Sequence, residues 1–514
     1  MILRRRALLQ SLAGLGAAFA LPPGLVLAQA SEPFSFETLK ALARDLAQRP
    51  HAPRPEAAGN LDAITYDEGF RIVFDPARTV TMGADWGLQF FPLGTLTRRP
   101  VEINLVEEGV SRRLTYDPSW FIAPEDSPFR SLPGDAGFAG FRAVAGPGRA
   151  EWLSFLGASY FRSPGPFAQY GLSARGLALD TYAEAEEEFP DFTRFWLGPD
   201  AQGRLVVHAL LEGPGVVGAY RFVHDLSGDA LAQEVEATLV FRRAVAQPGY
   251  APLTSMFWYG ENSSGPRPDW RPEIHDSDGL AIWTGAGERI WRPLSNPPRV
   301  VTSVFVDHNP RGFGLIQRDR DHDHYLDRQA HYDRRPSLWV EPIGVWGRGS
   351  VRLVEVPTQS ETLDNIVAFW TPAASPQPGR PVDLRYRLTW DGDAPGLETL
   401  ARVVSTRSGR AGRPGAPAEA GRRIAVEFQG ANLTGLDPDH DARPVVTAAR
   451  GRVGAVELAV GDPTETGYAR TWRLIFDVAP TWHEPADVRA FIQTGSGRRL
   501  TEVWTAQIFP EPAT

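Results

Sequence analysis

The chain of 514 residues contains no cysteine. This absence excludes a disulfide scaffold, a thiolate nucleophile, a zinc ribbon and an iron–sulfur cluster. An excess of positive charge is missing as well, because 53 Lys and Arg stand against 62 Asp and Glu and the formal net charge is −9. Nucleic-acid-binding proteins need a basic face for their phosphate contacts, so we expect no nucleic-acid partner.

Long hydrophobic runs are missing after the first thirty residues, since no later stretch approaches the roughly 18 apolar residues of a spanning helix. Three arginines at positions 4–6 precede an uncharged run over residues 7–27, and Ala-Gln-Ala at 28–30 forms a small-residue cleavage site before Ser31. This order predicts a secretory signal peptide of the twin-arginine type over residues 1–30, rather than a transmembrane anchor. We therefore expect a periplasmic protein without stable membrane insertion.

The mature chain is predicted to be all-β after one amphipathic helix. Ser35 caps that helix and Pro50 ends it, and its apolar face is formed by Phe36, Leu39, Ala43 and Leu46. Short segments with period-2 alternation follow at residues 101–105, 205–211, 235–241, 351–356, 384–390, 424–428, 456–460 and 472–478. Many such segments separated by turn residues indicate antiparallel sheets packed as sandwiches. The absence of a βαβ alternation argues against a Rossmann or TIM-barrel fold, and the absence of a fixed-period repeat disfavours a propeller.

One composition change divides the mature chain. Residues 392–422 are rich in Gly, Pro, Ala and Arg and are predicted to be a linker. Residues 31–391 before it are predicted to form one large β-sandwich, and residues 423–514 after it suit a small immunoglobulin-like sandwich. Two interpretations of the linker stay open: a solvated connection, or an arginine-rich flap over a groove, in cis or from a second subunit.

The familiar catalytic and metal-binding motifs are absent. The sequence has no P-loop, no G-x-S-x-G elbow and no H-E-x-x-H motif. Residues 319–324 begin like a calcium loop, but His324 occupies the glycine position and Ala330 occupies the position of the closing glutamate. His322, His324 and His331 fit an exposed polar loop better than a metal cluster. We therefore predict no metal and no cofactor.

Aromatic, acidic and arginine residues concentrate between Met256 and Trp370. Aromatic rings stack on the C–H faces of sugars, while fixed charged groups bond the hydroxyls, so this mixture is typical of a carbohydrate site. Glycoside hydrolysis needs two carboxyl groups in such a site. The alternative is that most of these aromatic side chains fill the core of a large sandwich. The candidate sugar-binding residues from this window are His275, Tyr259, Trp283 and Trp339.

Two acidic patterns within the window are the candidates for catalysis. The first, residues 272–279, is a polar, turn-prone segment with acids on both sides of Ser277. In the second, residues 357–365, a helical turn would place Glu361 and Asp364 on one face by their i,i+3 spacing. Each acid could equally close an ordinary turn before a strand.

Several long segments carry a family resemblance. They are LGASYFR (156–162), YGLSARGLALDT (170–181), APLTSMFWYGEN (251–262), RPEIHDSDGL (271–280), WRPLSNP (291–297), GFGLIQRDRDHDHY (312–325), YDRRPSLWVEP (332–342) and DNIVAFW (364–370). Through these segments, nearly the whole mature chain resembles the periplasmic glucan biosynthesis family, and its sequence is more similar to the D-type than to the G-type members.

The resemblance implies a fold and an activity. The fold would be a large sandwich of the galactose-mutarotase-like type followed by an immunoglobulin-like sandwich. D-type members are similar to hydrolases that cut linear β-1,2-glucan endo-wise with inversion. By motif, Asp364 would then be the general acid and Asp276 would act on the water-activating side. Glu361 would support the site, with Tyr332 and Arg335 along the bound glucan.

The rival expectation is a non-catalytic protein that binds glucan during its assembly or branching. In that case the same acids would only bond sugar hydroxyls. Linear β-1,2-glucan is the expected partner on the hydrolase interpretation, and a homodimer is an alternative that the sequence leaves open.

Overall fold

The computed structural model describes residues 27–83, 86–145, 150–228, 230–263, 267–412, 421–461, 471–481 and 484–510. The predicted signal peptide therefore lies almost entirely outside the described residues. Helix α1 (Phe36–Ala47) begins as predicted, because the Ser35 side chain accepts a hydrogen bond from the Thr38 N–H at 3.2 Å. Its buried face, Leu39 and Ala43, packs beside Trp196. Within the described residues, no helix has the length and apolar character needed to cross a membrane.

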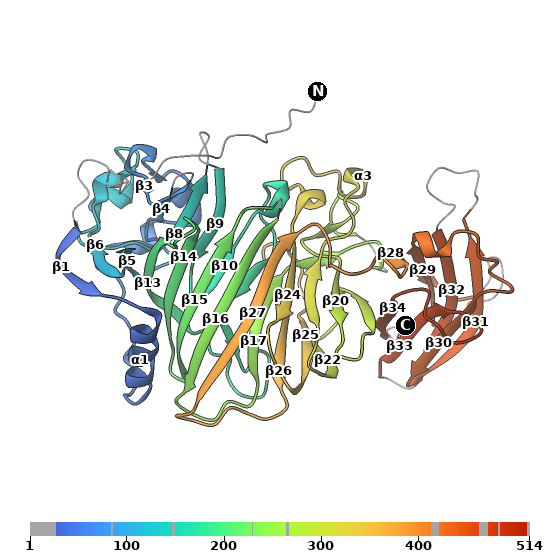
Figure 1. Cartoon of the computed structure of the whole chain (residues 1–514). Helices are drawn as coiled ribbons and strands as arrows, with labels where there is room; N and C mark the ends of the chain where they lie inside the picture. The colour runs from blue at the N-terminus through green and yellow to red at the C-terminus, as the bar shows by residue number, and fades with distance from the viewer. Residues whose placement is uncertain are drawn as a thin grey trace, which may run out of the picture.

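Two extended sheets dominate the chain, so the predicted all-β class is confirmed (Figure 1). Among the described residues, fifteen strands form the first sheet, in the order β1 (Leu27–Pro33), β6 (Val110–Leu114), β5 (Glu102–Glu107), β13 (Asp191–Pro199), β14 (Leu205–Glu212), β15 (Val216–Asp225), β16 (Leu231–Phe241), β27 (Pro381–Asp391), β24 (Ser337–Pro342), β23 (Gly312–Ile316), β20 (Gly279–Trp283), β21 (Arg289–Pro293), β34 (Val503–Ile508), β33 (Ala486–Gln493) and β30 (Arg443–Ala449).

The second sheet follows the order β22 (Val301–His308), β25 (Arg348–Glu355), β26 (Ile366–Pro372), β17 (Pro248–Ser255), β11 (Ser173–Arg175), β10 (Tyr160–Arg162), β9 (Ala150–Leu156), β8 (Gly140–Ala145), β4 (Trp86–Phe91) and β3 (Val80–Thr81), with β12 (Leu177–Leu179) on β17. Smaller pairs are β18 (Phe257–Tyr259) with β19 (Ile274–His275) and β2 (Val73–Phe74) with β7 (Phe121–Ile122). Short helices α2 (Tyr66–Phe70) and α3 (His322–Tyr325) lie between strands.

The core of the large sandwich lies between these two sheets. Phe141 of β8 meets Phe195 of β13 at 5.1 Å between ring centroids, and Phe155 of β9 meets Phe222 of β15 at 5.4 Å. All four rings are buried, and each buried side chain of this size contributes about 1.5–3 kcal/mol of burial free energy. The alternation that predicted residues 384–390 as a strand places Leu384, Tyr386, Leu388 and Trp390 in this core.

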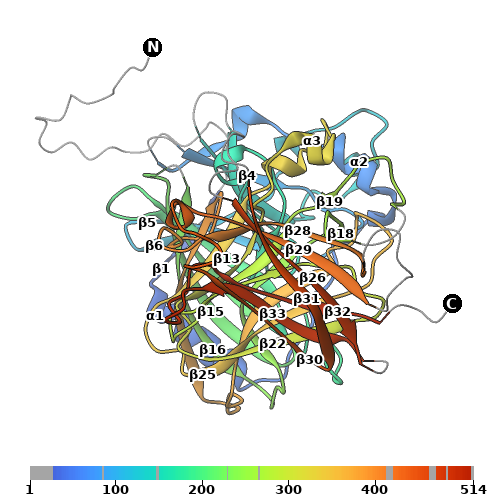
Figure 2. The same ribbon diagram turned by 90° about the vertical axis from the view of Figure 1, so that its right-hand side faces the viewer.

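A smaller sandwich forms the C-terminal end (red in Figures 1 and 2). One of its sheets has the order β28 (Arg402–Arg410), β29 (Arg422–Gln429), β32 (Thr471–Pro480) and β31 (Gly451–Val460). Its other sheet, β34, β33 and β30, continues the large sheet, since β34 runs parallel to β21 with Trp504 opposite Trp291. Phe476 and Trp504 meet between the layers at 5.7 Å. The galactose-mutarotase-like and immunoglobulin-like types stay predictions.

The expected linker at residues 392–422 looks different in the structure. Arg402–Arg410 form strand β28, which pairs with β29 around a bulge near Val403. The Val403 side chain is buried, so a short apolar anchor lies within an otherwise glycine- and arginine-rich segment. Residues 413–420 lie outside the described residues, and the expected flap stays a prediction.

Candidate active site

The segment after β19 turns two neighbouring side chains to opposite sides. Successive residues of an extended chain point in opposite directions, so His275 and Asp276 cannot share a face. The backbone N–H of Asp276 donates to the Met256 carbonyl at 2.8 Å and fixes the turn against β18. Asp276 is buried, and among the described residues its Oδ1 has no hydrogen-bond partner. The nearest cation is Arg335, whose Nε lies 3.5 Å from that oxygen.

The surroundings of Asp276 act on its charge in both directions. Burial raises its pKa, and the nearby carboxyl of Asp364 raises it further. Arg335, Arg162 and His275 lower the pKa by favouring the ionised form. The pKa of Asp276 is raised overall, although Arg335, Arg162 and, from the other side of the turn, His275 favour its ionised form.

Asp364 lies immediately before β26, in a position that Asn365 fixes. The Asn365 side chain accepts from the Phe257 N–H at 2.9 Å and donates to the carbonyls of Phe257 at 3.0 Å and Val356 at 2.8 Å. These bonds tie the start of β26 to β18, which leads to the Asp276 turn. The buried Asn365 amide therefore helps to hold Asp364 near the Asp276 turn, although Asn365 belongs to no catalytic motif.

The Asp364 carboxyl itself is half-exposed and has one cationic neighbour. Its side chain is 44% exposed, and Oδ2 lies 3.7 Å from Nη2 of Arg162 on β10. Desolvation by the surrounding protein raises the pKa of Asp364, and the positive charge of Arg162 opposes this shift. Asp364 is thus a solvent-reachable carboxyl with a raised pKa, as a general acid requires.

Glu361 is held by its neighbours on both oxygens. Arg271 donates to Oε2 at 2.8 Å and to Oε1 at 3.1 Å, and the Tyr332 hydroxyl donates to Oε2 at 2.5 Å. The same guanidinium also binds Asp327 at 2.8 Å and Asp269 at 2.9 Å. Burial and the bond to Glu361 raise the pKa of Tyr332, so it stays a donor. Glu361 is therefore oriented by this network.

Arg335 and Tyr259 complete this group in different ways. The guanidinium carbon of Arg335 lies 4.9 Å from the centre of the Tyr332 ring, and Nη1 donates to the Tyr170 carbonyl. The buried Tyr259 hydroxyl donates to the Arg271 carbonyl at 3.1 Å, and burial raises the pKa of Tyr259 to about 12. Tyr259 thus supports the Arg271 segment from behind.

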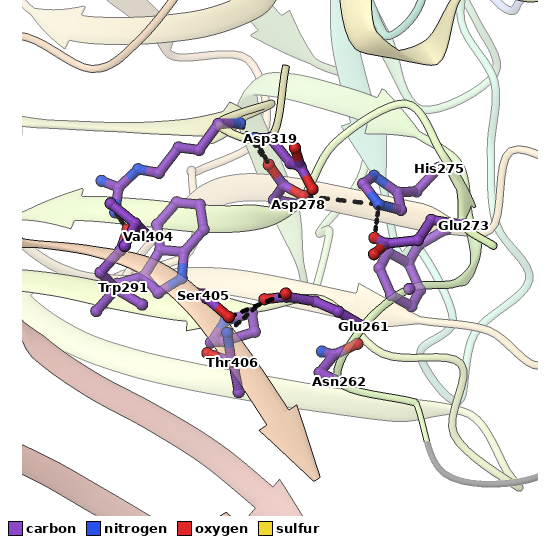
Figure 3. A pocket seen from close by; sticks show the side chains of 15 residues that line it. Glu261, Asn262, Glu273, His275, Asp278, Trp291, Asp319, Val404, Ser405 and Thr406 are labelled. Carbon is purple, nitrogen blue, oxygen red and sulfur yellow. Dashed lines mark hydrogen bonds and ion pairs between the residues drawn. The ribbon is translucent and has the colours of Figure 1, made fainter. Parts of the chain in front are cut away.

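His275 points to the other side of the turn, into a small polar pocket beside the C-terminal sandwich (Figure 3). Its Nδ1 is bonded to Gln317 at 3.1 Å and its Nε2 to Glu273 at 3.1 Å. Although burial lowers the pKa of His275, the bond to Glu273 and the charge of Asp278 dominate and raise it to about 9. The ring of His275 therefore lies on the other side of the turn from the Asp276 carboxyl, and its role as a sugar contact stays a prediction.

Trp339 and Trp283 also lie away from the acids. Trp339 is buried in the core that the small sandwich shares with the large sheet. Trp283 packs at the edge of that core, with the Arg289 guanidinium 3.3 Å from its ring centre. Trp339 is thus a core residue and Trp283 is partly buried against the same core, and their roles as sugar contacts stay predictions.

One group of described side chains has the spacing of metal ligands. Ligand atoms of Glu273, Asp319 and His324 lie within 4.8 Å of one another. His324 is already bonded to Asp319 at 2.6 Å, and Glu273 is bonded to His275. The acids and imidazoles of this group therefore satisfy one another.

The fold and the acid cluster together define an all-β protein with two perturbed carboxyl groups beside arginines. Residues 34–508 match the family model described as "Periplasmic glucan biosynthesis protein, MdoG". The chain belongs to this family. It is 45% identical to glucans biosynthesis protein D 2 of Ralstonia nicotianae, covering 93% of this chain and 91% of that protein.

Two further relatives have similar names. Glucans biosynthesis protein D of Stenotrophomonas maltophilia is 44% identical over 94% of this chain and 91% of its own length. The protein of that name from Xanthomonas oryzae pv. oryzae is 41% identical over 99% of this chain and 98% of its own length.

Proposed function

We propose that this chain is a periplasmic hydrolase that cuts linear β-1,2-glucan endo-wise with inversion. The observation that carries the proposal is the pairing of Asp276 with Asp364, two carboxyl groups with raised pKa values within reach of Arg162 and Arg335. Two such groups flanking one glycosidic bond are what glycoside hydrolysis requires. The proposed route to the periplasm is the twin-arginine signal over residues 1–30.

We assign different roles to the two acids from their positions. Two neighbouring carboxyl groups do not both ionise readily, so one retains the proton. Asp276 is buried beside Arg335, with 3.5 Å between Oδ1 and Nε, whereas Asp364 is half-exposed and has Arg162 as its cationic neighbour. We assign the catalytic proton to Asp364, because its 44% exposed carboxyl can reach a bound glucan and donate to the glycosidic oxygen. Ionised Asp276 takes a proton from the attacking water, directly or through a bridging hydroxyl. The water oxygen bonds to the anomeric carbon from the face opposite the leaving sugar as the C–O bond to that sugar breaks.

The remaining residues bind and orient. Arg162 and Arg335 donate to sugar hydroxyls in the groove, and Tyr332 lies beside them. Glu361, held by Arg271, fixes the Tyr332 hydroxyl and the segment that carries Asp364. No covalent intermediate is part of this mechanism.

A direct test is Asp364→Asn in the full-length chain, assayed for new reducing ends from linear β-1,2-glucan. Loss of a general acid lowers kcat by about 10²–10⁴-fold. The matched control is Asp135→Asn, because Asp135 is an exposed turn residue and its variant should keep full activity. Activity of Asp364→Asn at the wild-type level would refute the assignment. NMR of the first anomer released by the wild type tests inversion.

A second candidate is a glucan-binding protein without hydrolytic activity. The word "biosynthesis" in the names of the relatives favours it. Tight binding of β-1,2-glucan by the wild type with no new reducing ends after prolonged incubation would select this function over the hydrolase.

A further inference from the structure

An apolar pocket of about 430 Å³ opens on the N-terminal part of the large sandwich. This volume falls within the range of about 300–1,000 Å³ that is usual for ligand sites. The pocket lies between α2 and the outer sides of β4, β8 and β9, and among its lining residues are Phe70, Phe91, Leu96, Arg142 and Leu156. It is separate from the acid pair and plays no part in the mechanism above.

The rim of this pocket displays large apolar side chains to solvent. Tyr66 is 66% exposed, Phe70 is 69% exposed and Leu96 is 76% exposed. The rings of Tyr66 and Phe70 are perpendicular, with their centroids 4.8 Å apart. Single exposed apolar residues are ordinary, but several around one cavity indicate a binding surface.

Helix α2 is fastened in place, so this display is built into the fold. Thr65 caps the helix by accepting the Glu68 N–H, and the Thr95 N–H donates to the Ile64 carbonyl at 3.0 Å. Arg71 ties the last turn to Glu68 at 2.7 Å.

Strand register connects the pocket to the acid site. Arg142 on β8 pairs with Ser154 on β9, and Ser154 pairs with Arg162 on β10. Residues paired directly across antiparallel strands point to the same side of a sheet. Two strand spacings place Arg142 about 10 Å from Arg162, which lies beside Asp364.

A chain of hydrogen bonds connects Arg142, at the apolar pocket, with Arg335, at the acid site. The Tyr170 hydroxyl donates to Glu151 at 2.5 Å, and Arg142 donates to the other oxygen of Glu151 at 3.2 Å. The Tyr170 carbonyl accepts from Arg335, which neighbours Asp276. A band of hydroxyl and guanidinium groups therefore runs from the acids to the apolar pocket.

We propose that the pocket framed by Tyr66, Phe70 and Leu96 binds the distal arm of a linear β-glucan whose scissile bond lies at Asp364. This inference rests on the proposed function. Sugar hydroxyls bond the polar band, and the apolar face of a distal sugar packs on the exposed rings. Continuity with the acid site favours glucan over a second copy of the chain or an apolar segment of another protein. Long chains should therefore bind more tightly than short ones.

The test is a double variant, Tyr66→Ala with Phe70→Ala, in the full-length chain. Asp364→Asn is added to every protein compared, so that the glucan is not cut during calorimetry. Loss of two aromatic contacts should weaken the binding of long linear β-1,2-glucan by about 5- to 100-fold. A short β-1,2-oligosaccharide that spans only the acid site should bind as before. Leu96→Ser provides a second variant of the same pocket.

The matched control is Val306→Ala, which removes an apolar side chain that is 80% exposed on β22, at the far edge of the same sheet. Unchanged affinity for long chains in both pocket variants would overturn the inference while leaving the hydrolase intact. A changed sedimentation coefficient with unchanged glucan affinity would overturn it in favour of protein docking. Failure of the parent to bind any glucan would overturn the proposed function as well.

Discussion

Replacement of Arg271 by alanine should destabilise the segment that carries the candidate site. The guanidinium is 10% exposed and binds Asp327, which is also 10% exposed, at 2.8 Å. Breaking a buried ion pair costs about 3–5 kcal/mol, because the remaining charge loses its partner. Asp327 keeps two backbone N–H donors, so the lower end applies. Glu361 is 34% exposed and keeps Tyr332, and Asp269 is 24% exposed, so the loss of these two more exposed pairs adds at most about 1 kcal/mol. The expected loss is therefore about 3–4 kcal/mol.

Two measurements on the full-length protein check this value. Urea unfolding followed by tryptophan fluorescence gives the change in stability, and hydrogen exchange over residues 267–275 and 327–335 locates it. Activity should fall by about 10²-fold, because a displacement of roughly 1 Å in an oriented group has that effect. Arg271→Lys keeps one charge but loses the bidentate fork, so it should recover only part of the stability. The reasoning is refuted if the unfolding free energy of Arg271→Ala lies within about 1 kcal/mol of the wild-type value and the variant retains its hydrogen-exchange protection.

Three further predictions concern buried polar groups. Asn365→Ala removes two hydrogen bonds to Phe257 and one to Val356, and it should lower the unfolding free energy by about 2–3 kcal/mol in urea titration; a loss below about 0.5 kcal/mol contradicts this. Glu502→Gln weakens the buried pair with Arg318 and should speed proteolysis between the sandwiches, whereas unchanged cleavage contradicts it. The raised pKa of His275 adds about 3 kcal/mol to the free energy of unfolding below pH 6.5, and this contribution is lost by pH 9. The free energy of unfolding should therefore fall between pH 6.5 and 9 in the wild type and remain level there in His275→Gln.

The strand pattern was predictable because burial on one face of a sheet forces alternation. Residues 384–390 show this, with Leu384 and Tyr386 buried and Arg385 exposed. Strand β28 was not predicted, since its two buried side chains, Val403 and Thr406, are surrounded by residues of linker composition. The same alternation predicts that the side chains of His275 and Asp276 lie on opposite sides of the chain, because neighbouring residues in a strand face opposite ways.

In the candidate site, only the acids that lie in recognisable sequence motifs could be predicted. Asp276 and Asp364 lie in such motifs. In contrast, Arg271 bonds Glu361, which is ninety positions further along the chain, and Arg162 contacts Asp364 from another strand. Such pairings depend on the fold and leave no local pattern. Aromatic content likewise cannot tell a sugar contact from a core residue, and Trp339 is in the core.

The parallel pairing of β21 with β34 makes the small sandwich part of the same hydrogen-bonded sheet as the large one. A truncated chain that ended near residue 391 would leave the backbone groups of β21 without their partner strand. An open strand edge of this kind recruits other chains, so such a fragment should aggregate. Evolutionary exchange of the C-terminal sandwich is constrained for the same reason, because any replacement has to supply a strand in the register of Trp504 opposite Trp291.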